Sequence, residues 1–375
     1  MSRLTEFNDQ PPRMVFISMT NAVGGAENVL QLLANSESST MIFLKRMFSN
    51  VLKAGSGKRT YLTEGSLLLG FIKLVKEVHG YSDGYILFST HPYLNAYLGI
   101  LKRMGLIKVP VIVRESCCVF SRYSGLKKLS YSLAYRLGYP AVDLVICQTD
   151  LMRTELLQHN NFLSQEKAIV LNNPFDLEYV RSRAVHMPDD EDAAGSYICS
   201  AGRLIPIKGF DLLIKAFSRL ADSNEDLKLV ILGDGKERNK LENLIEELNL
   251  KGRVILKGHV GNPIPFFKNA KVCVVSSIQE GFPNVLLEMM AVNPSVVSTL
   301  CAGGIENIPS ISKVQVNNIE ALTAAIQNAL EAENASQPEV SAAYLKNRTP
   351  DNFMNSALRE VSLRYKNPCT HNVQA

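Results

Sequence analysis

The sequence of 375 residues contains no tryptophan, and aromatic residues make up only 7% of it. A basic nucleic-acid-binding protein usually interleaves aromatic side chains with its cations, so this composition argues against that class. No stretch approaches the ~20 consecutive apolar residues of a membrane-spanning helix. The polar start, residues 1–13, also lacks the apolar segment of a secretory signal. We therefore expect a protein that stays in the cytoplasm.

The patterns of several enzyme and metal-site classes are also missing. The sequence has no H-E-x-x-H motif, no paired C-x-x-C motifs and no Ser/His/Asp order, so protease, lipase and zinc-site interpretations have no support. The seven cysteines are scattered apart from Cys117–Cys118, and we expect buried, reduced thiols. Residues 190–192 have the form D-x-D, but neither flank resembles a strand, which favours a solvated linker over a metal site.

The composition that is present is that of a globular chain, and the length predicts two domains. The net charge of +4 is unevenly distributed. Residues 1–185 carry 21 Lys and Arg against 14 Asp and Glu, whereas residues 186–375 carry 19 against 22. The basic front half indicates an anionic partner, and composition alone leaves nucleic acid, membrane and phosphate open.

Short apolar runs alternate with helical patterns, which is the β-α-β rhythm of a parallel sheet covered by helices. The rhythm stops at an acidic run containing Pro188 and Gly195 and restarts at Tyr197. We therefore predict an α/β protein with two Rossmann-like domains facing across a cleft. The predicted parts are an N-terminal domain (1–186), a linker (187–196), a C-terminal domain (197–349), and a final helix and tail (350–375). Ligands bind such sheets beyond the carboxyl ends of the strands.

The segment from Glu280 to Glu288 follows a predicted strand and opens a helix. Gly281 permits a sharp turn, Pro283 suits a first helical turn, and the free amides there attract anions. The carboxylates of Glu280 and Glu288 would accept hydrogen bonds from sugar or ribose hydroxyls of the same phosphate-bearing ligand. Both glutamates could equally be solvated surface residues.

The segment from Ala201 to Phe210 also links a strand to a helix, and Arg203 and Lys208 give it two cations. Arginine grips phosphate bidentately, and two cations roughly neutralise a diphosphate. Solvated surface cations are the alternative explanation.

Four further features lie at strand ends. Gly233 begins a G-x-G that lacks the third glycine of a dinucleotide fingerprint, because Arg238 stands there. Gly24–Gly25 permits close approach of a phosphate or acceptor, or forms a plain tight turn. His91 could transfer a proton or be structural, and Arg114–Glu115 is similarly placed.

Together these segments resemble the family-4 retaining glycosyltransferases of the GT-B fold, most strongly from Ile198 to Asn307. The matching patterns are G-R-x5-G over residues 202–209, the G-D-G at 233–235, and E-G-F-P-N-x-x-x-E over residues 280–288. Residues 24–27, Gly-Gly-Ala-Glu, match the first glycine-rich loop of many members.

The resemblance implies a UDP- or GDP-sugar as the donor substrate, with no metal ion or other cofactor. It also implies that the final helix crosses back onto the first domain. Arg203 and Lys208 would bind the diphosphate, and Glu288 would bind the ribose. The candidate catalytic residues are Arg203, Lys208, Glu280, which would contact the transferred sugar, and His91, which would lie near the reacting centre. The candidate donor-binding residues are Gly24, Gly25, Arg203, Lys208, Gly233, Gly281, Phe282, Pro283, Asn284, Val285 and Glu288.

The implied reaction is retaining, metal-independent transfer of a sugar to a growing glycan, a lipid-linked surface polysaccharide or lipopolysaccharide intermediate. Arg114 and Glu115 are the candidate acceptor residues. Asn293 stands where relatives commonly have glycine, and Leu300 where a polar residue is common. Peripheral docking on the anionic inner face of the cell membrane would use basic residues of the front half, among them Lys45, Arg46, Lys53, Lys58, Arg59, Lys102, Arg103, Arg122, Lys127 and Lys128.

Two alternatives remain. The first is a sugar-nucleotide epimerase of the same fold. The second, of another class, is a basic nucleic-acid-binding protein.

Overall fold

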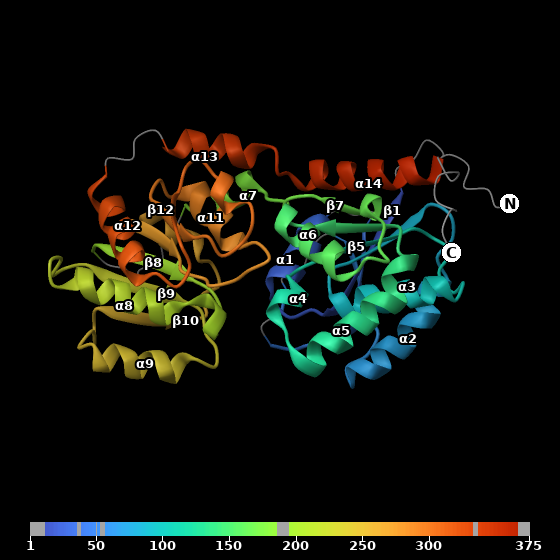
Figure 1. Cartoon of the computed structure of the whole chain (residues 1–375), viewed down its shortest axis with the longest axis horizontal. Coiled ribbons are helices and arrows are strands. Elements are labelled where there is room, and N and C mark those ends of the chain that lie inside the picture. Colours follow the sequence, from blue (N-terminus) through green and yellow to red (C-terminus); the bar gives the residue numbers. More distant parts are fainter. Residues whose placement is uncertain are drawn as a thin grey trace. The chain divides into compact units, whose positions relative to one another are not determined.

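The computed structural model describes residues 12–35, 39–49, 51–52, 57–185, 195–332 and 337–366. The chain forms two compact units (Figure 1). One comprises Met1–Pro174 with Pro350–Ala375, and the other comprises Phe175–Thr349. Each unit is built on one parallel sheet, so the predicted α/β class with two Rossmann-like domains is confirmed. Residues 187–194 of the expected linker, with the D-x-D run, lie outside the described residues, as does Lys53.

The sheet of the first unit has the order β3-β2-β1-β4-β5-β6-β7. Its strands are short apolar runs, and β6 is buried at every position, as expected for a parallel strand covered on both faces. The strands are β1 (Arg13–Thr20), β2 (Thr40–Lys45), β3 (Lys58–Tyr61), β4 (Tyr85–Ser89), β5 (Val111–Arg114), β6 (Leu144–Cys147) and β7 (Ala168–Val170).

Helices cover both faces of this sheet. One hydrophobic cluster unites α2 (Leu67–His79), α3 (Pro92–Arg103), α4 (Val119–Arg122), α5 (Gly125–Gly138) and α6 (Asp150–His159) with the sheet. The cluster on the other face includes residues of α1 (Gly25–Leu33) and α14 (Pro350–Lys366).

The final helix returns to the first unit, as predicted. Phe353, Ala357 and Val361 recur every four residues on α14 and are buried in the cluster that contains α1. The ring of Phe353 lies 6.4 Å from that of Phe88 on β4. Arg364 donates a hydrogen bond to the backbone oxygen of Asp143 at 3.1 Å. Apolar packing along one helical stripe thus joins the two ends of the sequence in one unit.

The sheet of the second unit has the order β10-β9-β8-β11-β12-β13. Its strands are β8 (Tyr197–Ala201), β9 (Lys228–Leu232), β10 (Val254–Gly258), β11 (Val272–Val275), β12 (Val296–Thr299) and β13 (Ser312–Val314). Its helices are α7 (Leu177–Ser182), α8 (Phe210–Ala221), α9 (Arg238–Glu247), α10 (Ile264–Asn269), α11 (Asn284–Val292), α12 (Ile319–Glu331) and α13 (Gln337–Lys346).

The unit boundary differs from the predicted position at residue 186. Phe175, Val180 and Ala184 are buried in the same cluster as Leu286 and Met290 of α11, so the segment containing α7 belongs to the second unit. Helix α7 has only six residues, too few for a recognisable apolar period.

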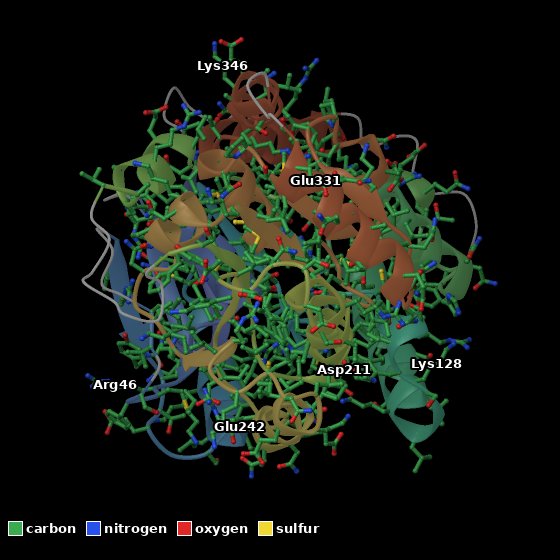
Figure 2. The ribbon with its side chains drawn as sticks, turned by 90° about the vertical axis from the view of Figure 1, so that its left-hand side faces the viewer. Arg46, Lys128, Asp211, Glu242, Glu331 and Lys346 are labelled. Atoms are coloured by element: carbon green, nitrogen blue, oxygen red, sulfur yellow. The ribbon has the colours of Figure 1, made fainter. Side chains whose placement is uncertain are left out.

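Many charged side chains lie on the surface, as expected for residues that favour water, whereas Arg114 and Glu115 are buried. Arg46, Glu242, Glu331 and Lys346 are exposed and project away from the ribbon in Figure 2. Among the described residues, none of the helices has the length and apolar character needed to cross a bilayer.

Candidate active site

The order of the strands reverses once in each sheet, and several of the predicted site residues lie in loops at these reversals. In the first unit β1 lies between β2 and β4, and in the second unit β8 lies between β9 and β11. The loops leaving the carboxyl ends of two such neighbouring strands run in opposite directions and leave room for a ligand.

In the second unit, the loops after β8 and β11 are joined by an ion pair. The Nζ atom of Lys208 lies 2.6 Å from Oε1 of Glu280, and both side chains are largely buried. The same oxygen accepts a hydrogen bond from the Ser277 hydroxyl at 2.7 Å. Arg203, on the loop that carries Lys208, is exposed. The structure therefore brings two predicted site residues, 72 positions apart in sequence, into direct contact.

Backbone contacts hold these loops together. The amide of Ile278 donates to the Ile207 oxygen at 2.8 Å, and the amide of Glu280 donates to the Cys301 oxygen at 2.7 Å. Gly209 has a φ of +60°, and a Cβ there would lie 2.3 Å from the backbone oxygen of Ser276. Glycine is thus required by both the turn and the close approach of the two loops.

The loop after β9 is fixed in the same way. A Cβ on Gly233, which has a φ of +129°, would lie 2.0 Å from the Gly202 oxygen. The Leu204 amide donates to the oxygen of Asp234 at 3.0 Å. Gly233 therefore allows the loop after β9 to pack closely against the loop that carries Arg203. This packing explains the G-x-G pattern without a dinucleotide-binding fingerprint.

The predicted anion-binding segment leads into α11. Gly281, Phe282 and Pro283 are buried and precede the helix, whereas Asn284 and Val285 begin it and are partly exposed. The first-turn amides of a helix carry partial positive charge. The predicted helix start is therefore present, with Pro283 directly before the helix, and anion binding there stays a prediction.

Sequence analysis missed Arg348, which lies beside this segment. Its guanidinium carbon lies 5.6 Å from the centre of the Phe282 ring and 4.4 Å from that of Tyr344. Burial lowers the pKa of Arg348, and within the described residues its Nη1 atom has no hydrogen-bond partner. No local motif marks Arg348, because only the fold brings the end of α13 to α11.

Glu288 lies on α11 and is half-buried. Within the described residues we find no hydrogen bond or ion pair to its carboxylate. Burial raises the pKa of Glu288 to about 7, against an opposing attraction from Arg183. A carboxyl group with these properties is uncommon on a helix surface, and its role in binding stays a prediction.

In the first unit, the loops after β1 and β4 carry Gly24, Gly25 and His91. Gly24 precedes α1, and a Cβ there would lie 2.3 Å from Oε2 of Glu27. His91 immediately precedes α3, and its oxygen accepts the Asn95 amide at 2.8 Å. Burial lowers the pKa of His91, and its Nδ1 atom is buried without a partner among the described residues. Burial therefore favours the neutral form of the imidazole.

Arg114 and Glu115, the candidate acceptor residues, are both buried. Arg114 donates to Thr90 Oγ1 at 3.1 Å and to Asn173, while its Nε atom has no partner in the described part of the chain. Burial lowers the pKa of Arg114 to about 10. Because Thr90 precedes His91, Arg114 supports the loop that carries the histidine.

The Glu115 carboxylate is enclosed by two tyrosines. Tyr135 donates to Oε2 at 2.5 Å and Tyr139 donates to Oε1. Burial raises the pKa of Glu115, and these hydrogen bonds oppose the rise. Both carboxylate oxygens are thus occupied inside the unit, which favours a structural role for Glu115. Its contact with an acceptor stays a prediction.

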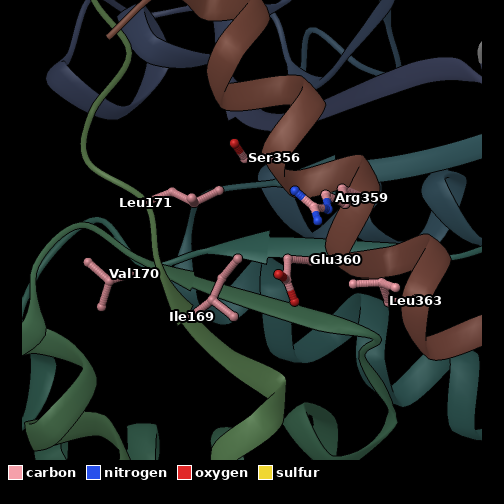
Figure 3. Close-up of a pocket in the computed structure, with 7 residues that line it drawn as sticks. All are labelled: Ile169, Val170, Leu171, Ser356, Arg359, Glu360 and Leu363. Carbon is pink, nitrogen blue, oxygen red and sulfur yellow. The ribbon is translucent and has the colours of Figure 1, made fainter. Parts of the chain in front are cut away.

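A separate pocket of about 450 Å³ lies in the first unit, beside edge strand β7 (Figure 3). It contains none of the predicted site residues and is not part of the candidate site. Its lining consists of Ile169, Val170, Leu171, Ser356, Arg359, Glu360 and Leu363. In the described part of the chain, no group of three or more His, Cys, Asp or Glu residues is placed to hold a metal ion.

Known proteins resemble both the sequence and the fold. The chain is 34% identical over 205 residues to N-acetylgalactosamine-N,N'-diacetylbacillosaminyl-diphospho-undecaprenol 4-alpha-N-acetylgalactosaminyltransferase of Campylobacter jejuni. This match covers 54% of each protein, so the chain spans about half the length of that relative. A second Campylobacter jejuni protein, GalNAc-alpha-(1->4)-GalNAc-alpha-(1->3)-diNAcBac-PP-undecaprenol alpha-1,4-N-acetyl-D-galactosaminyltransferase, is 26% identical over 308 residues, which covers 74% of this chain and 76% of that protein.

The crystal structure of Anabaena Alr3699/HepE in complex with UDP-glucose matches with a TM-score of 0.77 at 17% identity, over 93% of this chain and 99% of that one. This likeness shows the fold. These comparisons do not favour the epimerase or the nucleic-acid-binding alternative. Residues 188–346 match the family model described as Glycosyl transferases group 1. The matches together support a glycosyl transferases group 1 domain in this part of the chain and the GT-B fold for its two units.

Proposed function

We propose that the chain is a retaining, metal-independent glycosyltransferase that moves a sugar from a UDP- or GDP-sugar to a growing lipid-linked glycan. The observation that carries this proposal is the largely buried Lys208–Glu280 pair between the loops after β8 and β11. The two Campylobacter jejuni relatives are named as sugar transferases with undecaprenol diphosphate-linked glycans in their names, which supports the acceptor class.

The donor diphosphate would bind at Lys208 and Arg203. A lysine ammonium has three N–H donors, and Glu280 accepts from one of them in the structure. The other donors of Lys208 are free to bind phosphate oxygens. Arg203 is exposed and can add a bidentate contact. These charges would stabilise the diphosphate as it leaves the sugar, which is the main electrostatic demand of the reaction.

The transferred sugar would contact Glu280. Its Oε1 atom accepts from both Lys208 and Ser277, whereas we find no hydrogen bond to Oε2 within the described residues. The carboxylate is therefore held in one orientation with one oxygen open to a sugar hydroxyl. Such fixed orientation lowers the entropic cost of positioning the substrate.

Glu288 would bind the ribose, and the amides that begin α11 would approach the donor phosphates. A half-buried carboxylate without a protein partner can accept two hydrogen bonds from neighbouring ribose hydroxyls. Phe282, Pro283, Asn284 and Val285 would shape this part of the site, with Gly281 and Gly233 allowing close packing.

The first unit would bind the acceptor. We propose that Gly24 and Gly25 allow close approach of the reactants and that the neutral His91 lies near the reacting centre. Arg114 and Glu115 are buried, so they would act on the acceptor through the loop that His91 occupies. No protein base is assigned, because the leaving phosphate itself would take the acceptor's proton. The enzyme would act at the cytoplasmic face of the membrane.

The test is a panel of UDP- and GDP-sugars with lipid-linked and water-soluble glycan acceptors. The proposal expects nucleoside diphosphate release that depends on the acceptor and persists in excess EDTA. NMR of the product should show the anomeric configuration of the donor. Interconversion of the sugar without release of nucleoside diphosphate would establish the epimerase instead, and an inverted product would refute retention.

A further inference from the structure

Helix α5 presents an apolar stripe to solvent. Leu126, Leu129, Leu133 and Leu137 are 85%, 65%, 58% and 43% exposed. At 100° per residue, these positions fall within about 80° of one another around the helix axis. Single exposed leucines are ordinary, but four on one stripe of a helix form a continuous apolar surface that needs an explanation. We call these four residues the leucine face.

The leucine face is held rigidly. Tyr131 and Tyr135, on the opposite side of α5, are buried in the core of the first unit. A Cβ on Gly138 would lie 2.0 Å from the oxygen of Ala96, and one on Gly99 would lie 2.1 Å from the oxygen of Gly138. This close glycine-mediated packing fixes α5 against α3. The four leucines therefore face outward because the helix has no freedom to turn them inward.

The charged residues of the chain segment that carries the leucine face are all basic. Residues 116–142 contain four Lys or Arg residues and no Asp or Glu. On the helical projection, Arg136 flanks the stripe on one side and Lys127 lies on the other. The Lys127 Nζ atom lies 3.9 Å from the centre of the Tyr123 ring, and Arg122 also lies against that ring. Lys128 projects from the same helix in Figure 2.

Helix α2 adds a second apolar stripe to the same layer. Leu68, Leu69 and Ile72 are exposed, and the exposed Lys73 and Lys76 follow on the same helix. Helices α2 and α5 both pack against the sheet face that carries α3. The buried positions of each helix lie opposite its exposed apolar residues, so both stripes point away from the sheet.

We propose that the leucine face of α5, with the apolar stripe of α2, inserts into the headgroup region of an anionic lipid membrane. Leucines would enter the boundary with the acyl chains while the flanking cations bind lipid phosphates. The absence of carboxylates from residues 116–142 gives the surface the charge complementarity that an anionic leaflet requires. The inference rests on the proposed function in one respect, because a lipid-linked acceptor gives the docking its purpose.

This surface contains only some of the cations expected from the front half, namely Arg122, Lys127 and Lys128. Lys102 is engaged by Asp143, and Arg46 lies 3.2 Å from Glu64. Only the pattern of exposure on the folded helix separates the α5 leucines from core leucines.

The test is co-sedimentation with vesicles of phosphatidylcholine alone or mixed with phosphatidylglycerol. The wild-type protein should bind the anionic vesicles at low salt and lose binding as salt increases. The combined variant Leu126→Ser, Leu129→Ser and Leu133→Ser should have an affinity for the anionic vesicles at least about tenfold below that of the wild type. The variant Lys127→Gln with Arg136→Gln should bind about 25-fold more weakly, because each basic residue contributes about fivefold.

The matched control is Leu363→Ser, on the opposite face of the sheet, whose leucine is 48% exposed. It should bind vesicles like the wild type. Absence of wild-type binding to anionic vesicles, or equal binding by the triple-leucine variant, would overturn the proposal. A wild-type dimer that becomes a monomer in the triple-leucine variant would assign the face to a second copy of the chain and overturn it as well.

Turnover with a water-soluble acceptor separates this proposal from the proposed function. The α5 variants should keep wild-type rates in that assay, which also shows that they fold. Vesicle binding without any sugar transfer would refute the proposed function while supporting the membrane surface. Sugar transfer without vesicle binding would support the proposed function and refute the membrane surface.

Discussion

The Glu288 carboxyl group couples stability to pH in a direction that can be measured. Burial raises its pKa from 4.5 to about 7. Below pH 4.5 the group is protonated in both the folded and unfolded states and has no effect. Between pH 4.5 and 7 the unfolded chain loses the proton while the folded protein keeps it, so stability falls as pH rises. Above pH 7 the loss is complete, at about 3 kcal/mol for a shift of this size.

Replacing the carboxyl by an amide of the same shape should remove this cost. We expect Glu288→Gln to raise the free energy of unfolding at pH 8 by up to about 3 kcal/mol and to have little effect at pH 4.5. Urea unfolding at the two pH values, followed by circular dichroism, measures the difference. Glu247→Gln, on the exposed surface of α9, is the matched control and should change stability little at either pH.

The same substitution should weaken binding of the donor substrate. If Glu288 accepts hydrogen bonds from the ribose, the amide loses the charge-assisted part of them, which is worth about tenfold in affinity for the nucleoside diphosphate. Calorimetric titration of UDP and GDP at pH 8 checks this. Equal stabilisation at both pH values would refute the burial argument, and a more stable variant with unchanged nucleotide affinity would remove Glu288 from the binding site.

Three further changes test other parts of the molecule. Lys208→Ala should lower kcat by about a hundredfold, because a charge that stabilises the leaving diphosphate is lost. The control Lys240→Ala, on the surface of α9, should leave kcat unchanged. Near-normal turnover of Lys208→Ala would contradict the proposed role of Lys208 in diphosphate binding. Gly209→Ala should lower the free energy of unfolding by about 2 kcal/mol or more in urea. The control is Gly252→Ala, where φ is also positive but a Cβ would contact no described atom, and it should cost about 1 kcal/mol. Equal costs would show that the close contact between the loops is unimportant. Because burial lowers the pKa of His91, acidification below the usual histidine pKa of 6.5 should lower the stability of the fold. His91→Asn should reduce this loss in thermal melts between pH 7 and 5. The same pH profile in the variant and the wild type would contradict the burial argument for His91.

The sequence predicted most of the fold because its elements follow local rules. The segment from Ala201 to Phe210 was expected to link a strand to a helix, and it does link β8 to α8, which begins at Phe210. Strand β3, with the sequence Lys-Arg-Thr-Tyr, was missed because an edge strand needs no continuous apolar run. Helix α7 was assigned to the wrong unit because six residues contain too little pattern to show which core they cover.

The contact between Lys208 and Glu280 in the second unit has a topological explanation. Lys208 and Glu280 follow strands that are neighbours in a parallel sheet, and loops at the same sheet edge meet. Arg348 reaches the same region from the end of α13, which no periodicity in the sequence reveals. The exposed leucines of α5 were missed for a related reason, since a leucine has the same sequence signal whether it faces the core or water.

Glu115 and Glu280 show why residue type at a strand end is insufficient to identify a site. Both carboxylates follow a parallel strand and both were candidates, Glu115 for its place at the strand end and Glu280 for the motif at the start of a helix. In Glu115 each oxygen accepts a tyrosine hydroxyl from within the same unit. In Glu280 one oxygen takes both protein donors, and we find no hydrogen bond to the other within the described residues. A buried carboxylate whose oxygens are both engaged stabilises the fold, whereas a half-engaged one is oriented by the protein and still able to accept a ligand's hydroxyl. The number of open acceptor positions, which only the folded structure supplies, separates the two roles.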